Sequence, residues 1–185
     1  MEGLRSIVLM GLRGSGKSTV GLRLTEKLPR FAYQDLDDAV LGDAEQDTVS
    51  QIVEDEGWDG FRFREYEQLQ IWLWSLHHLP ERRMVLSLGG GVPTYEKSLA
   101  LLQSAELHGM IRLVYLRATP STLAERMESN DDRPSLTGDD PVEEIQKVFA
   151  DRDELYRSIA DVVIDVDTQS IDETADAVIA SLEQL

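Results

Sequence analysis

The sequence predicts a three-layer α/β/α fold, in which helices cover both faces of a central five-stranded parallel sheet. Short apolar runs rich in Val, Ile and Leu alternate along the chain with longer helical patterns, and this alternation is typical of βαβ units. A glycine-rich segment directly follows the first apolar run and opens the first helical pattern. The expected strands are residues 6–10, 31–35, 84–88, 111–116 and 161–166.

The expected helices fill the intervals around these strands. They are residues 17–28, 48–56, 58–78, 94–107, 119–129, 142–159 and 171–185. Pro93, Pro120 and Pro141 lie at or near helix starts, where a missing N–H group costs nothing. Residues 129–141 are polar and rich in turn-forming residues, so we expect a mobile loop there.

The composition limits the class of protein. At 185 residues, 42% of them hydrophobic, the chain is long enough for one buried core and short for two, so we expect a single domain over residues 1–185. A formal charge of -17 repels nucleic-acid phosphates and anionic lipid head groups, so neither nucleic acid nor membrane is an expected partner. The acidity fits adaptation to high salt or an ordinary solvated surface, and we favour the second.

Two further features bear on location. The chain has no cysteine, so nothing points to an oxidising compartment. The apolar run near the N-terminus is too short for a secretory signal or a membrane span. We therefore expect a cytoplasmic protein.

The glycine-rich segment GLRGSGKST, residues 11–19, fits the phosphate-loop pattern G-x-x-x-x-G-K-[ST] between an expected strand and an expected helix. Backbone N–H groups and the helix N-terminus would hold phosphates, Lys17 would reach the β and γ phosphates, and Ser18 would bind Mg²⁺. The expected nucleotide-binding residues are Gly14, Ser15, Gly16, Lys17, Ser18 and Thr19. The pattern predicts a P-loop NTPase fold without naming a reaction. The GTPase strings N-K-x-D and D-x-x-G do not occur.

Asp35 and Asp37 follow the second expected strand and can face the same side. One carboxylate could hold Mg²⁺ through water, and the other could orient an acceptor hydroxyl and take its proton. The alternative is that an aspartate here caps a helix N-terminus, and the sequence leaves both possibilities open.

Arg62 and Glu65 are three residues apart and share a helix face. They could form a surface ion pair of little value, or the glutamate could hold the arginine toward an anionic substrate group. The run Gly89, Gly90 and Gly91 lies at the carboxyl end of the third expected strand, where open α/β sheets bind ligands. We expect this run to let the backbone approach a second small molecule closely.

Three further arginines are candidates. Arg133 lies in the polar loop at residues 129–141, and such a loop beside a nucleotide would close as a lid and exclude water. Arg126 precedes it on an expected helix. Arg157 lies on the helix before the last strand, and by itself it reads as an exposed surface arginine.

The ordered set of motifs resembles the shikimate kinase family, P-loop enzymes related in fold to the nucleoside monophosphate kinases. The matching pieces are GLRGSGKST, the D-x-D of Asp35 and Asp37, the F-R-x-x-E of residues 61–65, the LGGG of residues 88–91, the R-P of residues 133–134 and the LYR of residues 155–157. The resemblance covers almost the whole chain. It implies one kinase domain with substrate-binding helices at about residues 37–80 and a lid at about residues 129–141.

The resemblance also implies a reaction and a set of roles. ATP would phosphorylate the 3-hydroxyl of shikimate with Mg²⁺ as cofactor, in the chorismate pathway of aromatic amino-acid synthesis, and the enzyme would be a monomer. By this resemblance, Ser18 and Asp35 would hold Mg²⁺, Lys17 and Arg133 would contact the migrating phosphoryl group, and Arg126 would contact adenine. Asp37 would bind the acceptor hydroxyl, and Arg62, supported by Glu65, would bind the substrate carboxylate together with Arg157. The ring hydroxyls would be contacted by Gly89, Gly90 and Gly91.

Three positions depart from the family pattern. Leu36 lies where Ser or Thr is frequent, Arg13 replaces a commoner Pro or Met, and Ser135 follows Arg-Pro where Leu is usual. The rival interpretations are another small-molecule kinase of this fold, such as a gluconate kinase, and a regulatory nucleotide-binding module without transfer activity.

Overall fold

The computed structural model describes residues 6–79, 81–127 and 141–183. Its sheet has five strands in the order β2-β3-β1-β4-β5, and each strand is parallel to its neighbours. The strands are β1 (Ser6–Met10), β2 (Phe31–Asp35), β3 (Arg83–Ser87), β4 (Ile111–Arg117) and β5 (Val162–Asp165). The expected parallel sheet is therefore confirmed, with every strand within one or two residues of its predicted limits.

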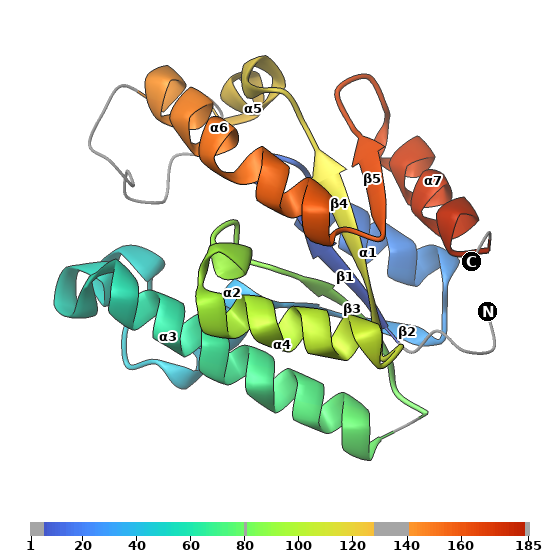
Figure 1. Ribbon diagram of the computed structural model, residues 1–185, viewed down its shortest axis with the longest axis horizontal. Helices are drawn as coiled ribbons and strands as arrows, with labels where there is room; N and C mark the ends of the chain where they lie inside the picture. Colours follow the sequence, from blue (N-terminus) through green and yellow to red (C-terminus); the bar gives the residue numbers. More distant parts are fainter. Residues whose placement is uncertain (1–5, 80, 128–140, 184–185) are drawn as a thin grey trace.

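The helices form two layers around this sheet (Figure 1). They are α1 (Lys17–Lys27), α2 (Leu36–Asp43), α3 (Val49–His78), the 3-10 helix η1 (Val92–Thr94), α4 (Glu96–Leu107), α5 (Pro120–Met127), α6 (Pro141–Ile159) and α7 (Ile171–Glu183). Helix α1 packs against α7 on one face, while α4 and α6 pack against β4 on the other and α3 lies against α4. Among the described helices none is long and apolar enough to serve as a membrane span.

The core is centred on β1, whose five residues are all buried. This strand lies between β3 and β4, so both of its edges are paired and both of its faces are covered. A strand buried on both faces reads as a continuous apolar run, which is why Ile7, Val8 and Leu9 show no alternation with polar residues.

The segment after β2 holds one helix that was not predicted and two that were. Helix α2 was not expected, and it begins directly at Leu36 because Asp35 caps it: the Asp35 side chain accepts a hydrogen bond from the backbone N–H of Asp37. The two helices expected at residues 48–56 and 58–78 are both present within α3, and the expected break between them lies at Gly57, whose φ of 72° and ψ of 174° are non-helical. Thr48 begins this helix with a capping box.

The sheet topology brings the two glycine segments together. After β1 the chain passes to α1 on one face of the sheet, and after the neighbouring β3 it passes to α4 on the other face. The carboxyl ends of β1 and β3 are therefore a topological switch point of the sheet. The backbone N–H of Leu88 donates to the carbonyl of Leu9 at 3.0 Å, which extends the pairing to the ends of both strands. The P-loop and the glycine run therefore start side by side.

Candidate active site

The P-loop wraps the N-terminus of α1 as the sequence predicts. Gly14 and Gly16 have φ angles of 82° and 90°, in the left-handed region that favours glycine. Gly16 is also the N-cap of α1 and provides no side chain to satisfy the first N–H groups of the helix. Those N–H groups remain directed into the loop, which is the arrangement that binds phosphate.

Lys17 lies across the inside of this loop. Its Nζ donates to the carbonyl oxygens of Gly11 at 2.9 Å and Leu12 at 3.0 Å. The ammonium group is therefore kept at the loop by its backbone carbonyls, within the cavity where a nucleotide phosphate would be held.

A cavity opens beside the P-loop, and we call it the loop cavity. It is lined by Arg13, Gly14, Gly16, Lys17, Ser18, Thr19, Leu22, Tyr33, Asp35, Asp37, Asp38, Leu88 and Gly90. The structure thus brings together Lys17, Ser18, Asp35 and Asp37, as expected. Ser18 Oγ donates to Asp35 Oδ2 at 2.9 Å, and Asp37 is only 8% exposed. Asp35 is therefore the helix cap that was one of the two possibilities, since its Oδ1 caps α2, and it also lines the cavity, where its Oδ2 is bonded to Ser18.

A second cavity, the arginine cavity, lies between residues of α3, α5 and α6 beside the glycine run. Its lining is Leu12, Arg13, Trp58, Phe61, Arg62, Gly90, Gly91, Leu123, Met127, Glu144, Ile145, Val148 and Arg152. Arg13 and Gly90 line both cavities, so the two adjoin there.

Arg62 and Glu65 form the ion pair that their spacing predicts, and it is not a surface pair. The Arg62 side chain is 14% exposed and that of Glu65 is fully buried. The Arg62 guanidinium lies 5.3 Å from the ring centre of Trp58, one helical turn before it. Trp58 was missed as a site residue, although its i, i+4 spacing to Arg62 was a signal that the two share a face.

The glycine run lies directly against these charged groups. A Cβ built at Gly89 would lie 2.7 Å from Asp37 Oδ1 and would overlap Glu65, and a Cβ at Gly91 would overlap the Arg62 guanidinium. Gly90 is less crowded, since its Cβ would lie 3.4 Å from the backbone nitrogen of Arg13. A side chain at Gly89 or Gly91 would therefore have to displace the charged group beside it.

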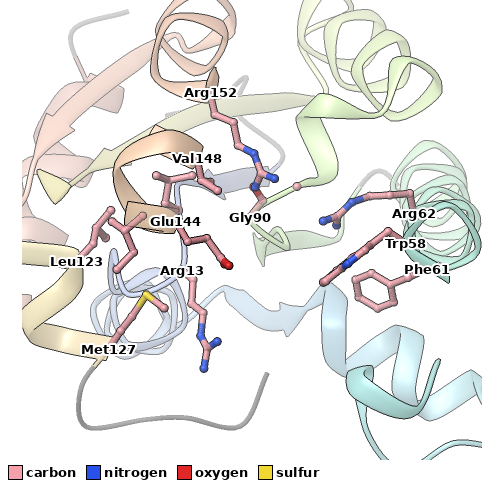
Figure 2. A pocket seen from close by; sticks show the side chains of 13 residues that line it. Arg13, Trp58, Phe61, Arg62, Gly90, Leu123, Met127, Glu144, Val148 and Arg152 are labelled. Atoms are coloured by element: carbon pink, nitrogen blue, oxygen red, sulfur yellow. The ribbon is translucent and has the colours of Figure 1, made fainter. Parts of the chain in front are cut away.

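The structure does not bring Arg157 into the site. Its side chain is 48% exposed, its Nε donates to Asp153 at 2.9 Å, and it lines neither cavity. Arg152 is in the arginine cavity instead. Figure 2 shows the guanidinium groups of Arg152, from α6, and Arg62, from α3, directed toward the same space near Gly90.

The reason for this correction is helical geometry. Five residues along an α-helix rotate a side chain by roughly 500°, so positions 152 and 157 are about 140° apart around the axis. Tyr156 shares the face of Arg152, and both donate hydrogen bonds to the carbonyl oxygen of Gly90. Burial raises the pKa of Tyr156 to about 12, so its hydroxyl stays a donor.

The two remaining predicted arginines are Arg126 and Arg133. Arg126, near the end of α5, lies beside the P-loop and donates to the carbonyl oxygens of Val166 at 2.9 Å and Gly14 at 3.4 Å. Arg133 and the expected lid at residues 129–141 lie outside the described residues, apart from Pro141, where α6 begins.

Comparisons with known proteins agree with this geometry. A family profile described as shikimate kinase matches residues 13–183. The protein named shikimate kinase 2 from Yersinia pestis (strain Pestoides F) is 38% identical over 165 residues, covering 87% of this chain and 86% of the relative. A shikimate kinase from Acinetobacter baumannii, solved in complex with shikimate, has a TM-score of 0.85 at 28% identity, covering 98% of this chain and 94% of that one. The shikimate kinase from Aquifex aeolicus has a TM-score of 0.75 at 29% identity, covering 96% of each chain. The chain therefore belongs to the shikimate kinase family.

Proposed function

We propose that this protein transfers the γ-phosphate of ATP to the 3-hydroxyl of shikimate, giving shikimate 3-phosphate and ADP. The observation that carries the proposal is the meeting of two cavities at Gly90, one lined by the P-loop and three aspartates, the other lined by three arginines. A phosphate donor and an anionic acceptor would thereby be held against each other. Phosphoryl transfer requires mainly such alignment and charge neutralisation.

The loop cavity would hold the nucleotide. The N–H groups at the start of α1 would bind the phosphates, and Lys17 would leave its carbonyl partners at Gly11 and Leu12 to contact the β and γ phosphates. Arg126 lies beside Gly14 and would contact the adenine end of the nucleotide. Arg133, from the lid expected at residues 129–141, would add positive charge to the migrating phosphoryl group.

Ser18 and Asp35 would hold Mg²⁺. Their oxygens lie 2.9 Å apart at the base of the P-loop, and a hydroxyl with a carboxylate is the hard oxygen set that Mg²⁺ prefers. In the described part of the chain no three His, Cys, Asp or Glu residues gather into a metal cluster. This fits Mg²⁺, which kinases hold through one or two protein oxygens with water and substrate phosphates completing the shell. When bound, the ion would neutralise charge on the phosphates.

The arginine cavity would hold the acceptor. Arg62 and Arg152 have N–H donors beyond their contacts with Glu65 and Gly90, and a guanidinium grips a carboxylate with two parallel hydrogen bonds. Gly90 and Gly91 would supply close backbone contacts to the ring hydroxyls. Asp37, beside Gly89, would orient the accepting hydroxyl and take its proton. Arg152 thus replaces Arg157 in the proposed carboxylate clamp.

The monomeric state stays a prediction of the sequence. The cytoplasmic location stays a prediction of the sequence.

The test is ADP release from the purified protein with Mg-ATP, comparing shikimate, gluconate and no acceptor in parallel. We expect release that depends on shikimate. Release that depends on gluconate would favour the rival kinase, and nucleotide binding without turnover on either acceptor would favour the regulatory module.

A further inference from the structure

Tyr33 lies inside the loop cavity, at a position to which the sequence assigned no role. It belongs to β2, two residues before Asp35, so both side chains face the same side of the strand. The Tyr33 hydroxyl donates to Asp35 Oδ2 at 3.0 Å and lies 3.1 Å from Ser87 Oγ on the neighbouring strand. Ser87 is fully buried, so it anchors the phenol from within the sheet.

With this contact, the Asp35 carboxylate is held from three directions. Oδ1 accepts from the backbone N–H of Asp37 at 3.0 Å, and Oδ2 accepts from Ser18 Oγ at 2.9 Å as well as from the phenol. The backbone contact belongs to the cap of α2 and the Ser18 contact to the proposed metal pair. The phenol contact is a third one, and it comes from a side chain of β2 itself.

The surroundings of Tyr33 keep its hydroxyl in place as a donor. Its ring packs directly against α1 at Gly21, where any Cβ would overlap the ring edge. A glycine inside a helix costs stability, and here it makes room for the aromatic ring.

We propose that Tyr33 is a positioning residue for the proposed magnesium site: it fixes the orientation in which Asp35, together with Ser18, takes the ion. This inference rests on the proposed function. Groups that orient metal-binding carboxylates by hydrogen bonds raise metal affinity, and their removal typically costs about 10- to 100-fold. A phenylalanine at this position would fill the same volume while losing the donor, so the hydroxyl can be tested separately from the packing.

The experiment measures Mg²⁺-linked ADP binding by titration calorimetry, which needs no turnover. Mg²⁺ should increase the affinity for ADP, and the quantity compared is the Mg²⁺ concentration at which half of this increase is reached. For Tyr33→Phe we expect this concentration to rise about tenfold, while the affinity for ADP without metal changes by less than about twofold. The matched control is Tyr66→Phe, which removes a phenol hydroxyl from the aromatic cluster of α3 and should leave both values unchanged.

A Tyr33→Phe protein that melts at a lower temperature with an unchanged Mg²⁺ requirement would overturn the inference, because the phenol would then be merely structural. If that variant does not fold, Ser87→Ala decides: it removes the anchor of the phenol, so the Mg²⁺ requirement should rise, and no rise would overturn the inference. A wild-type protein whose ADP affinity does not respond to Mg²⁺ would instead refute the proposed metal site itself.

Discussion

The guanidinium of Arg152 and the carbonyl oxygen of Gly90 are joined by a hydrogen bond of 2.6 Å, although the residues are 62 positions apart. The bond attaches α6 to the glycine run beyond β3, and Tyr156 adds a second donor to the same oxygen. The backbone of Gly90 therefore holds the Arg152 guanidinium in place, and the same glycine run would contact the acceptor.

This relationship predicts opposite results for two arginines on one helix. Arg152→Ala should raise the KM for shikimate by about 10- to 100-fold, since a hydrogen bond to a charged group contributes about 1.5–3 kcal/mol. The KM for ATP should change little. Arg157→Ala, which removes an exposed side chain outside both cavities, should leave the KM for shikimate within about twofold. Steady-state kinetics of the two variants measures both values, and a reversed order would restore Arg157 to the clamp.

The sheet, the P-loop and the pairing of Arg62 with Glu65 could be predicted because each depends on residues close in sequence. The alternation of apolar runs with helical patterns predicted the strands. The spacing of three residues predicted that Arg62 and Glu65 share one helix face. The sequence could not reveal that this ion pair is buried, because its burial comes from packing of α3 under the glycine run.

Choosing Arg152 over Arg157 required knowing which face of α6 meets the sheet. The helix has arginines at both positions, and local pattern alone does not orient it. Helix α2 was missed because the short polar segment at Asp35 fits a helix cap and a ligand-binding site equally well. In the structure Asp35 is both the cap of α2 and a residue of the loop cavity. In the sequence Tyr33 is an ordinary aromatic residue of a strand. Its contact with Ser87 could not be predicted, because it depends on β2 and β3 being neighbours in the sheet.

Glu65→Ala should destabilise the protein as well as the site. It leaves the Arg62 guanidinium without its buried counter-charge, and breaking a buried pair from one side costs about 3 kcal/mol or more. Urea denaturation should show this loss. Glu65→Gln, which preserves shape and some hydrogen bonding, should lose clearly less. Equal stability of Glu65→Ala and wild type would mean that the Arg62 guanidinium becomes hydrated by solvent when its counter-charge is removed.

Alanine substitutions along the glycine run should differ in severity. At Gly89 the new methyl group would crowd Glu65 and Asp37, and at Gly91 it would displace Arg62. Both variants should lose most activity with shikimate. Gly90→Ala meets backbone at 3.4 Å and longer, so it should be the mildest of the three. Values of kcat/KM for shikimate rank the variants, and Gly90→Ala as the most damaged would contradict this reading of the close approach.

Asp37→Asn tests the proton acceptor. The amide keeps the volume of a side chain that is only 8% exposed, but it cannot take a proton from the acceptor hydroxyl. We expect kcat to fall by about 100-fold or more, with the melting temperature and the KM for shikimate much less affected. Asp43→Asn, at the far end of α2 and outside both cavities, is the matched control for the loss of one carboxylate. Near-normal turnover of Asp37→Asn would show that alignment alone suffices.

Asp153 predicts a pH dependence of stability that is separate from catalysis. Burial raises the pKa of Asp153, but hydrogen bonds from Arg117, Arg157 and Tyr115 outweigh it and hold the pKa below its ordinary value of 3.8. A carboxyl group with a lowered pKa stabilises the fold above its unfolded pKa, and this contribution is lost as pH falls through the folded pKa. Asp153→Asn should therefore reduce the free energy of unfolding by about 2 kcal/mol at pH 7. The difference from wild type should shrink progressively below pH 3.8. Urea denaturation across this range measures it, and a difference that stays constant with pH would show that packing, rather than the carboxylate charge, holds α6 to β4.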